Sequence, residues 1–153
     1  MTKFSSEGGK AIFDILSKHW TVIAPVERPG KGRFSGTALV SYEQVQSFDE
    51  IEFFKKTYLS AKSVLLPIRQ AMFLFQDTNP EGSGLAFNIS QSRKMEEADG
   101  KIRPMIIFLR SCDIHAIKVL DAHFLNGGGY TDFYYSRLRQ KVKLFLIECE
   151  KPF

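Results

Sequence analysis

The last third of the chain carries the pattern that most constrains its fold. Residues 104–109 are a continuous apolar run, which is typical of a strand buried on both faces of a sheet. From Ile114 to Phe124 apolar residues then recur at every third or fourth position, which is the period of a helix. Residues 143–148 are a second strand of the buried type. Together these segments predict a parallel βαβ unit with a right-handed crossover.

Two further signals divide the connection between these strands. The run Gly127-Gly128-Gly129 is expected to end the first helix. Thr131 or Asp132 can then cap a second helix that runs through Arg139. The βαβ unit is therefore expected to contain two helices rather than one.

The N-terminal part predicts a helix followed by a β-hairpin. Ser5 or Ser6 can cap a helix that runs to about Ser17. Residues 20–26 are expected to form a strand that closes at Pro25, residues 28–32 a turn, and residues 34–42 the partner strand. With the βαβ unit behind it, this pattern predicts the α/β class, and α+β is the alternative.

The middle of the chain is less regular. Residues 47–59 have only weak helical spacing, residues 72–75 and 85–90 are possible strands, and the polar residues 91–101 are expected to be an exposed connection. A length of 153 residues suits one domain, residues 1–153. A subdivision into 1–100 and 101–153 is left open.

Composition excludes several classes of protein. Hydrophobic residues make up 44% and charged residues 25%, which is ordinary for a globular chain. No apolar run approaches the ~20 residues of a membrane-spanning helix, and no secretory signal is visible, so a cytoplasmic protein is expected. The net charge of +4 is scattered and accompanies no nucleic-acid-binding motif. The 14 phenylalanines suit a packed core or a face covered by another protein.

The candidate site follows from the βαβ prediction. Cys112 and Asp113 come directly after the first strand, next to Arg110, and Cys149 follows the second strand. Because parallel strands end at the same edge of a sheet, both cysteines should face one region, where open α/β folds bind ligands. A cysteine at a helix N-terminus is favoured as the thiolate, which is the usual ligand of iron–sulfur clusters. The chain has two cysteines, so it could supply only half of such a ligand set.

Simpler interpretations of the same residues stay open. A free cysteine usually acts as a small buried hydrophobe, and Arg110 and Asp113 could simply pair or cap the helix. A nucleotide-binding α/β domain would use the same sheet edge, but the chain lacks the glycine fingerprint G-x-G-x-x-G. No catalytic nucleophile or general base can be read from the spacing, so enzyme activity is undecided.

Several segments, in order along the chain, resemble one known family. These segments are Lys18-His19-Trp20-Thr21-Val22-Ile23-Ala24-Pro25, Gly32-Arg33-Phe34-Ser35, residues 104–116 with Arg110-Ser111-Cys112-Asp113, and residues 143–150 with Leu146-Ile147-Glu148-Cys149-Glu150. They resemble the A subunit of anaerobic sulfite reductase, and related segments occur in the β subunits of sulfhydrogenases. Asp121, Tyr135, Leu138 and Arg139 fall where that family has similar residues.

The resemblance implies an electron-transfer role. The A subunit of that family is an iron–sulfur protein thought to pass electrons from a flavin subunit, which oxidises NADH, to a sirohaem subunit that reduces sulfite to sulfide. The chain is then part of an oxidoreductase complex and is not catalytic alone. A non-redox docking module for partner subunits is the alternative, and a nucleotide-binding domain is the second alternative.

The chain also departs from the family. It lacks the downstream ferredoxin-type cysteine motifs and the Cys–x–Cys segment that follows the position of Cys149. The resemblance therefore implies an N-terminal fragment of a longer iron–sulfur protein, which alone holds few clusters or none. Cys112 and Cys149 are candidate ligands of a cluster shared with the missing segment, and Arg110 and Asp113 are candidates for its surroundings.

Overall fold

The computed structural model describes residues 6–66, 74–77, 85–88 and 104–148, which belong to two compact units. The smaller unit, within residues 67–103, contains the antiparallel pair β3 (Leu74–Asp77) and β4 (Leu85–Asn88). These strands match the two expected in the middle of the chain, and the expected connection at 91–101 lies outside the described residues. The larger unit joins the N-terminal and C-terminal parts of the sequence.

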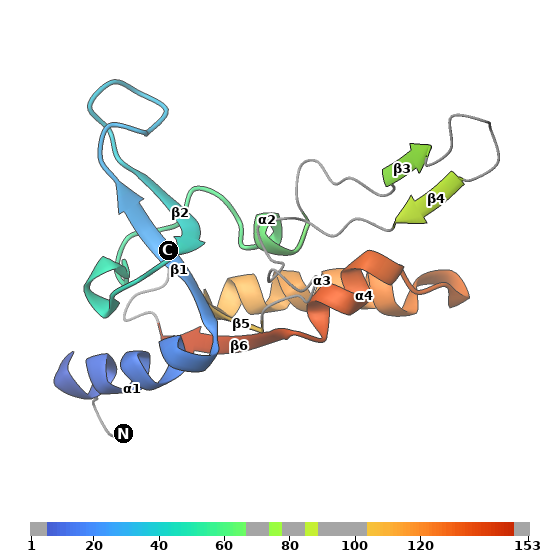
Figure 1. Ribbon diagram of the computed structural model, residues 1–153. Helices are drawn as coiled ribbons and strands as arrows, with labels where there is room; N and C mark the ends of the chain where they lie inside the picture. Colours follow the sequence, from blue (N-terminus) through green and yellow to red (C-terminus); the bar gives the residue numbers. More distant parts are fainter. Residues whose placement is uncertain (1–5, 67–73, 78–84, 89–103, 149–153) are drawn as a thin grey trace. The chain divides into compact units, whose positions relative to one another are not determined.

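The larger unit is built on a mixed four-stranded sheet (Figure 1). The strands are β1 (Thr21–Arg28), β2 (Leu39–Gln44), β5 (Met105–Arg110) and β6 (Val142–Ile147). Their order in the sheet is β2-β1-β5-β6, with β1 antiparallel to β2 and parallel to β5, and β5 parallel to β6. The α/β class, the hairpin and the parallel C-terminal strands are thus confirmed.

Helices surround this sheet at the places where the sequence predicts them. The first, α1 (Ser6–His19), precedes β1, and the two helices of the crossover are α3 (Ser111–Asn126) and α4 (Phe133–Arg139). Asp132 caps α4, since its Oδ1 accepts a hydrogen bond from the Tyr135 N–H at 2.7 Å. The short helices are α2 (Lys62–Leu65), η1 (Phe48–Glu50) and η2 (Gly127–Gly129). No described helix has the length and apolar character needed to span a membrane.

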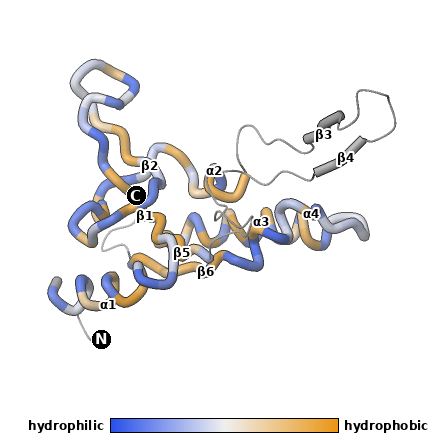
Figure 2. Tube along the Cα trace, viewed as in Figure 1, coloured by the Kyte–Doolittle hydropathy of each residue, from blue (hydrophilic) through white to orange (hydrophobic). Residues whose placement is uncertain are grey.

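The sheet separates two apolar layers, which follow from the alternation of side chains along each strand. On one face Phe13 of α1 packs with Val22 and Ala24 of β1 and with Ile106 and Phe108 of β5. The alternate residues of β5 point to the opposite face, where α3 contacts β5 and β6. All six residues of β5 are buried, as expected of the central strand of a parallel unit. Five of the six are apolar, and Figure 2 shows the hydropathy of each residue along the chain.

The second strand of the βαβ unit differs from its prediction. The sequence predicts that residues 143–148 are buried on both faces, but β6 lies at the edge of the sheet that the described residues form. Lys143 is exposed, and the side chains of Phe145 and Leu146 are 40% and 54% exposed. An apolar run shows that a strand forms, but it does not show whether a further strand or helix covers it.

The hairpin also has different bounds from those expected. The strand β1 continues through Pro25 to Arg28, because the Pro25 carbonyl points away from β2 and accepts from the Glu52 N–H at 2.8 Å. The proline nitrogen points the same way, so the ladder with β2 loses no hydrogen bond. The partner strand begins at Leu39 and not at Phe34, because residues 29–38 form a loop.

The short helix η1 follows the hairpin, and Ser47 and Glu50 form a capping box at its start. A segment without regular structure comes next and crosses the end of the sheet. The Tyr58 N–H then donates to the Val40 carbonyl at 2.8 Å, which fixes residues 52–60 beside β1 and β2. This covering segment, residues 52–60, supplies one wall of the candidate site.

Candidate functional site at the carboxyl ends of the parallel strands

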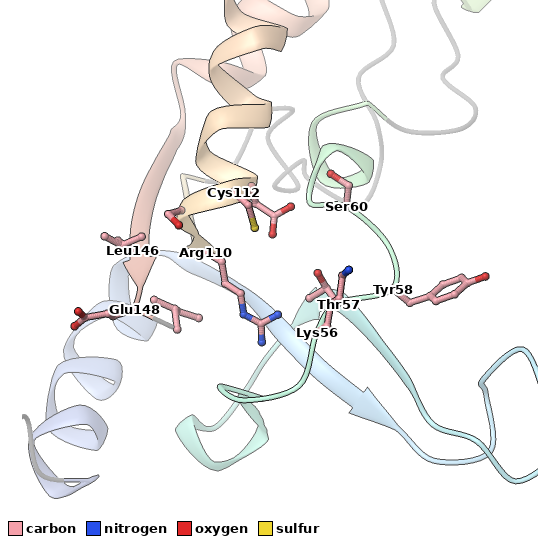
Figure 3. Close-up of a pocket in the computed structure, with 11 residues that line it drawn as sticks. Lys56, Thr57, Tyr58, Ser60, Arg110, Cys112, Leu146 and Glu148 are labelled. Atoms are coloured by element: carbon pink, nitrogen blue, oxygen red, sulfur yellow. The ribbon is translucent and has the colours of Figure 1, made fainter. Parts of the chain in front are cut away.

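A cavity of about 690 Å³ opens at the carboxyl ends of β5 and β6 (Figure 3). Its walls come from the start of α3, the end of β6 and the covering segment. This is the sheet edge where the sequence predicts a site, and where open α/β folds bind ligands. The lining residues are Lys56, Thr57, Tyr58, Ser60, Arg110, Ser111, Cys112, Asp113, Leu146, Ile147 and Glu148.

Cys112 is the second residue of α3 and borders this cavity. Its side chain is exposed and forms no disulfide, so it is not the buried small hydrophobe of the simpler interpretation. The N-cap position of α3 is Arg110, whose side chain makes no capping hydrogen bond to the first turn. The Cys112 side chain thus lies in the first turn of α3, where the backbone N–H groups of a helix favour negative charge.

Arg110 is a buried cation on the cavity wall, with 1% of its surface exposed. Its Nη2 donates to the backbone carbonyl of Phe53 at 3.4 Å and to that of Lys55. The side chain therefore ties the end of β5 to the covering segment. It also keeps a positive charge beside the cavity that Cys112 lines.

Asp113 is held by a residue from the hairpin. Its Oδ2 accepts a hydrogen bond from the Tyr42 hydroxyl at 2.6 Å, and both side chains are buried. Burial first, and then this hydrogen bond and the Asp113 charge, raise the pKa of Tyr42 well above its usual range, whereas the Arg110 charge opposes the shift. The phenol therefore stays protonated and keeps donating to Asp113, which fixes the first turn of α3 against β2.

Of the predicted site residues, the structure brings Arg110, Cys112 and Asp113 to one cavity. Cys149 lies outside the described residues, but it directly follows Glu148, which lines the same cavity. That Cys112 and Cys149 meet there stays a prediction. It is consistent with the parallel register, which pairs Arg110 with Ile147.

The sequence does not reveal the residues of the site that come from the covering segment and the hairpin. Lys56, Thr57, Tyr58 and Ser60 come from a segment with no regular pattern, and Tyr42 lies on the hairpin. The hydrogen bond between Tyr42 and Asp113 spans 71 positions of the chain, so no local signal announces it.

Three residues that the sequence resemblance singles out on α3 and α4, namely Asp121, Tyr135 and Arg139, have a structural role. Arg139 Nε donates to Asp121 Oδ1 at 2.9 Å, and the Tyr135 hydroxyl donates to the same oxygen at 2.7 Å. Arg139 also donates to the carbonyl of Val142, where β6 begins. These contacts join the two crossover helices to each other and to the last strand.

The described residues do not by themselves fit an iron–sulfur cluster. Among them, no three His, Cys, Asp or Glu side chains are grouped to hold a metal ion. A cluster needs four ligands, usually thiolates, and the whole chain contains two cysteines. Any cluster at this cavity would therefore need ligands from outside this sequence.

Comparison with known proteins supports the resemblance found in the sequence. The chain is 29% identical over 148 residues to the sulfhydrogenase 2 subunit beta of Pyrococcus furiosus. The match covers 96% of this chain and 37% of that protein, so the chain spans little more than a third of the relative's length. No family model matches the sequence, and no solved structure matches it. Over nearly its whole length the chain is thus similar to part of one curated protein, a sulfhydrogenase β subunit.

Proposed function

We propose that this chain is part of an electron-transfer subunit in a sulfhydrogenase-like oxidoreductase complex, and that it contributes two cysteine ligands to an iron–sulfur cluster. The relative is named as a subunit, which supports a role within a complex. The cavity at the carboxyl ends of β5 and β6 supports a ligand site at this edge. The remaining ligands would come from sequence beyond this chain, as the two-cysteine count requires.

One observation carries the proposal. Cys112 is exposed and lies in the first turn of α3, beside the cavity that Glu148 also lines. Cys149 directly follows Glu148 in the sequence. The Arg110 guanidinium and the start of α3 both favour negative charge there, so the site suits thiolates. The residues of this chain hold two thiolates and exclude part of the solvent; the cluster itself would supply the one-electron redox chemistry.

The finer proposal is the role implied by the sulfite reductase A subunit. Electrons would then pass from a flavin subunit that oxidises NADH, through this protein, to a sirohaem subunit that reduces sulfite. The sequence segments around Cys112 and Cys149 support it by their resemblance to that A subunit, whereas the relative found by comparison is a sulfhydrogenase subunit. Co-purification of a sirohaem protein from the native cells would distinguish it from a complex that contains a hydrogenase.

The test is the content of iron and acid-labile sulfide in anaerobically purified protein. It compares this chain with the full-length protein, and the full-length protein with its Cys112→Ala, Cys149→Ala and Ser111→Ala variants. We expect little iron in the isolated chain. In the full-length protein, each cysteine variant should lose the iron and sulfide of one cluster.

Ser111→Ala is the matched control, because Ser111 lines the same cavity and precedes Cys112. It should keep the full iron content. If all three variants keep it, Cys112 and Cys149 are spare thiols, and the chain acts as a docking module without a cluster. Exposed aromatic side chains such as Phe34 and Phe54 favour that second candidate.

A further inference from the structure

The tip of the β1–β2 hairpin, residues 29–38, extends beyond the sheet (Figure 1). The strand β1 pairs with β5 only over Thr21–Ile23, whereas it pairs with β2 as far as Arg28 and Leu39. The hairpin therefore continues past the four-stranded region as a two-stranded ribbon. Almost every residue of the hairpin tip is exposed.

The hairpin tip has a defined internal structure although it is exposed. The Gly32 N–H donates to the Thr37 carbonyl at 2.9 Å, and the Thr37 N–H donates to the Phe34 carbonyl at 3.1 Å. The Thr37 hydroxyl donates to the Phe34 carbonyl at 2.6 Å, and the Phe34 N–H donates back to that hydroxyl at 3.2 Å. These bonds fix the backbone that carries Phe34.

Gly32 is required for this arrangement. A Cβ atom at position 32 would overlap Thr37 Oγ1 and lie 2.8 Å from the Thr37 carbonyl carbon, which is backbone. Any larger residue would therefore push the two sides of the loop apart. The tip is preorganised, which lowers the entropy cost of binding.

Phe34 stands at this ordered tip with 71% of its surface exposed. Its neighbours Lys31 and Arg33 are exposed as well, and neither side chain forms an ion pair with another described residue. The hairpin tip contains no acidic residue. It therefore presents one large apolar side chain close in sequence to two cations.

The acidic residues at the base of the hairpin are already paired. Glu43 lies 2.7 Å from Arg28 Nη2, and Glu27 lies 2.5 Å from Lys55 Nζ. The hydrogen bond from Arg28, more than any other contact, lowers the pKa of Glu43. The Lys31 charge adds a smaller effect on the Glu43 pKa, and the tip itself, with Lys31 and Arg33 and no acidic residue, has a formal charge of +2.

From this geometry we propose that the hairpin tip docks into a partner protein that offers an apolar pocket rimmed by carboxylates. Phe34 enters the pocket, and Lys31 and Arg33 face its acidic rim. Such an arrangement, an aromatic anchor surrounded by polar contacts, is how a few residues carry most of the energy of a protein interface. The inference rests on the proposed function only in taking the chain to be a subunit of a complex.

The small number of cations at the tip favours a protein partner over nucleic acid or an anionic membrane. Two cations neutralise at most two phosphates, which gives weak binding to nucleic acid at physiological salt. At a membrane, two cations and one phenylalanine fall short of the several basic residues or the second anchor that stable attachment requires. A pocket that encloses Phe34 gains more from the same three side chains.

The test places a photoreactive phenylalanine analogue at position 34 of the full-length protein in its native cells. The matched control carries the analogue at position 130, because Tyr130 is 85% exposed on the α3–α4 turn, away from the tip. We expect position 34, and not position 130, to crosslink to one other protein. Peptide mapping should place the crosslink among apolar residues flanked by Asp and Glu.

Affinity for that crosslinked protein, purified, is then measured for point variants. Phe34→Ala should weaken binding about 30-fold, whereas Ser35→Ala should leave it unchanged. Reversing both tip charges (Lys31→Glu with Arg33→Glu) should weaken it further as salt is lowered. Gly32→Ala keeps every contact side chain, so weaker binding by this variant shows that the loop conformation matters.

The proposal is overturned if position 34 crosslinks only to a second copy of this chain, to nucleic acid or to lipid. It is equally overturned if the complex assembles and position 34 crosslinks to nothing. Iron content separates this result from the proposed function. A Phe34→Ala variant that keeps its iron but no longer binds the partner supports the docking tip independently of the cluster. A Phe34→Ala variant that keeps both its iron and its partner contradicts the docking tip.

Discussion

Two buried polar side chains, Arg110 and Asp113, connect distant parts of the chain to the start of α3. Arg110 donates to carbonyls of the covering segment, and Asp113 accepts from Tyr42 on the hairpin. Buried polar groups stabilise a fold only when they are paired, and both pairings lie beside the cavity that Cys112 lines. At this scale, the position of the Cys112 thiol depends on two long-range contacts.

Arg110→Gln should destabilise the fold, because the shorter side chain leaves the carbonyls of Phe53 and Lys55 without their buried donor. We expect the free energy of unfolding in urea to fall by about 2 kcal/mol. Backbone amides of the covering segment should also exchange faster with deuterium. Arg33→Gln on the exposed hairpin tip is the control and should shift stability by less than about 0.5 kcal/mol. An equal effect of the two variants would show that Arg110 does not hold the covering segment.

Tyr42→Phe tests the pKa of the buried phenol. In the folded chain this pKa lies above its usual value of about 10, so the folded state keeps the proton that the unfolded state loses. The stability that this proton confers is complete below about pH 10 and declines above it, by up to about 1.4 kcal/mol per pH unit. Urea unfolding midpoints between about pH 9 and 11.5 should fall less steeply in Tyr42→Phe than in the wild type. Parallel curves would show that the phenol is not perturbed.

At the scale of elements, the two parallel strands differ in their surroundings. All of β5 is buried, whereas β6 is the edge strand among the described residues and exposes two large side chains. Leu109 and Leu146 are cross-strand neighbours in register, with exposed fractions of 0% and 54%. The pair therefore offers an internal comparison of the central and the edge position.

Leu109→Ala should lower the free energy of unfolding by about 2–5 kcal/mol, because it leaves a cavity in the core. Leu146→Lys should change it by less than about 0.5 kcal/mol, since the side chain already meets water. Thermal or urea unfolding of the isolated chain measures both. A large loss of stability in Leu146→Lys would contradict the edge position of β6.

The βαβ unit could be predicted because its signals are local. An apolar run, a helical period, three glycines and a capping aspartate each specify structure within a few residues, and Asp132 caps α4 as expected. The edge position of β6 and the cavity wall at residues 56–60 could not be predicted from the sequence, because both depend on which distant segments pack together. The hairpin was placed correctly, but its second strand begins five residues late, since the Thr37 hydrogen bonds fold residues 32–37 into a loop.

At the scale of the whole molecule, one sheet unites segments from the two ends of the sequence. The strand β1 lies between β2 and β5, so the hairpin and the βαβ unit share a core. That arrangement places the covering segment over the carboxyl ends of the parallel strands and creates the cavity there. The proposed cluster site and the hairpin tip belong to this same unit, and they are separate surfaces with separate tests.

The central claim is that Cys112 and Cys149 supply two thiolates to one site. The most direct test uses a short bifunctional thiol reagent that becomes fluorescent only when it bridges two cysteines. The folded 153-residue chain should be bridged rapidly, and Cys149→Ala or unfolding in urea should abolish the signal. If the folded chain instead takes up one reagent molecule on each thiol without bridging, the two cysteines do not share a site, and the proposed cluster ligation is wrong.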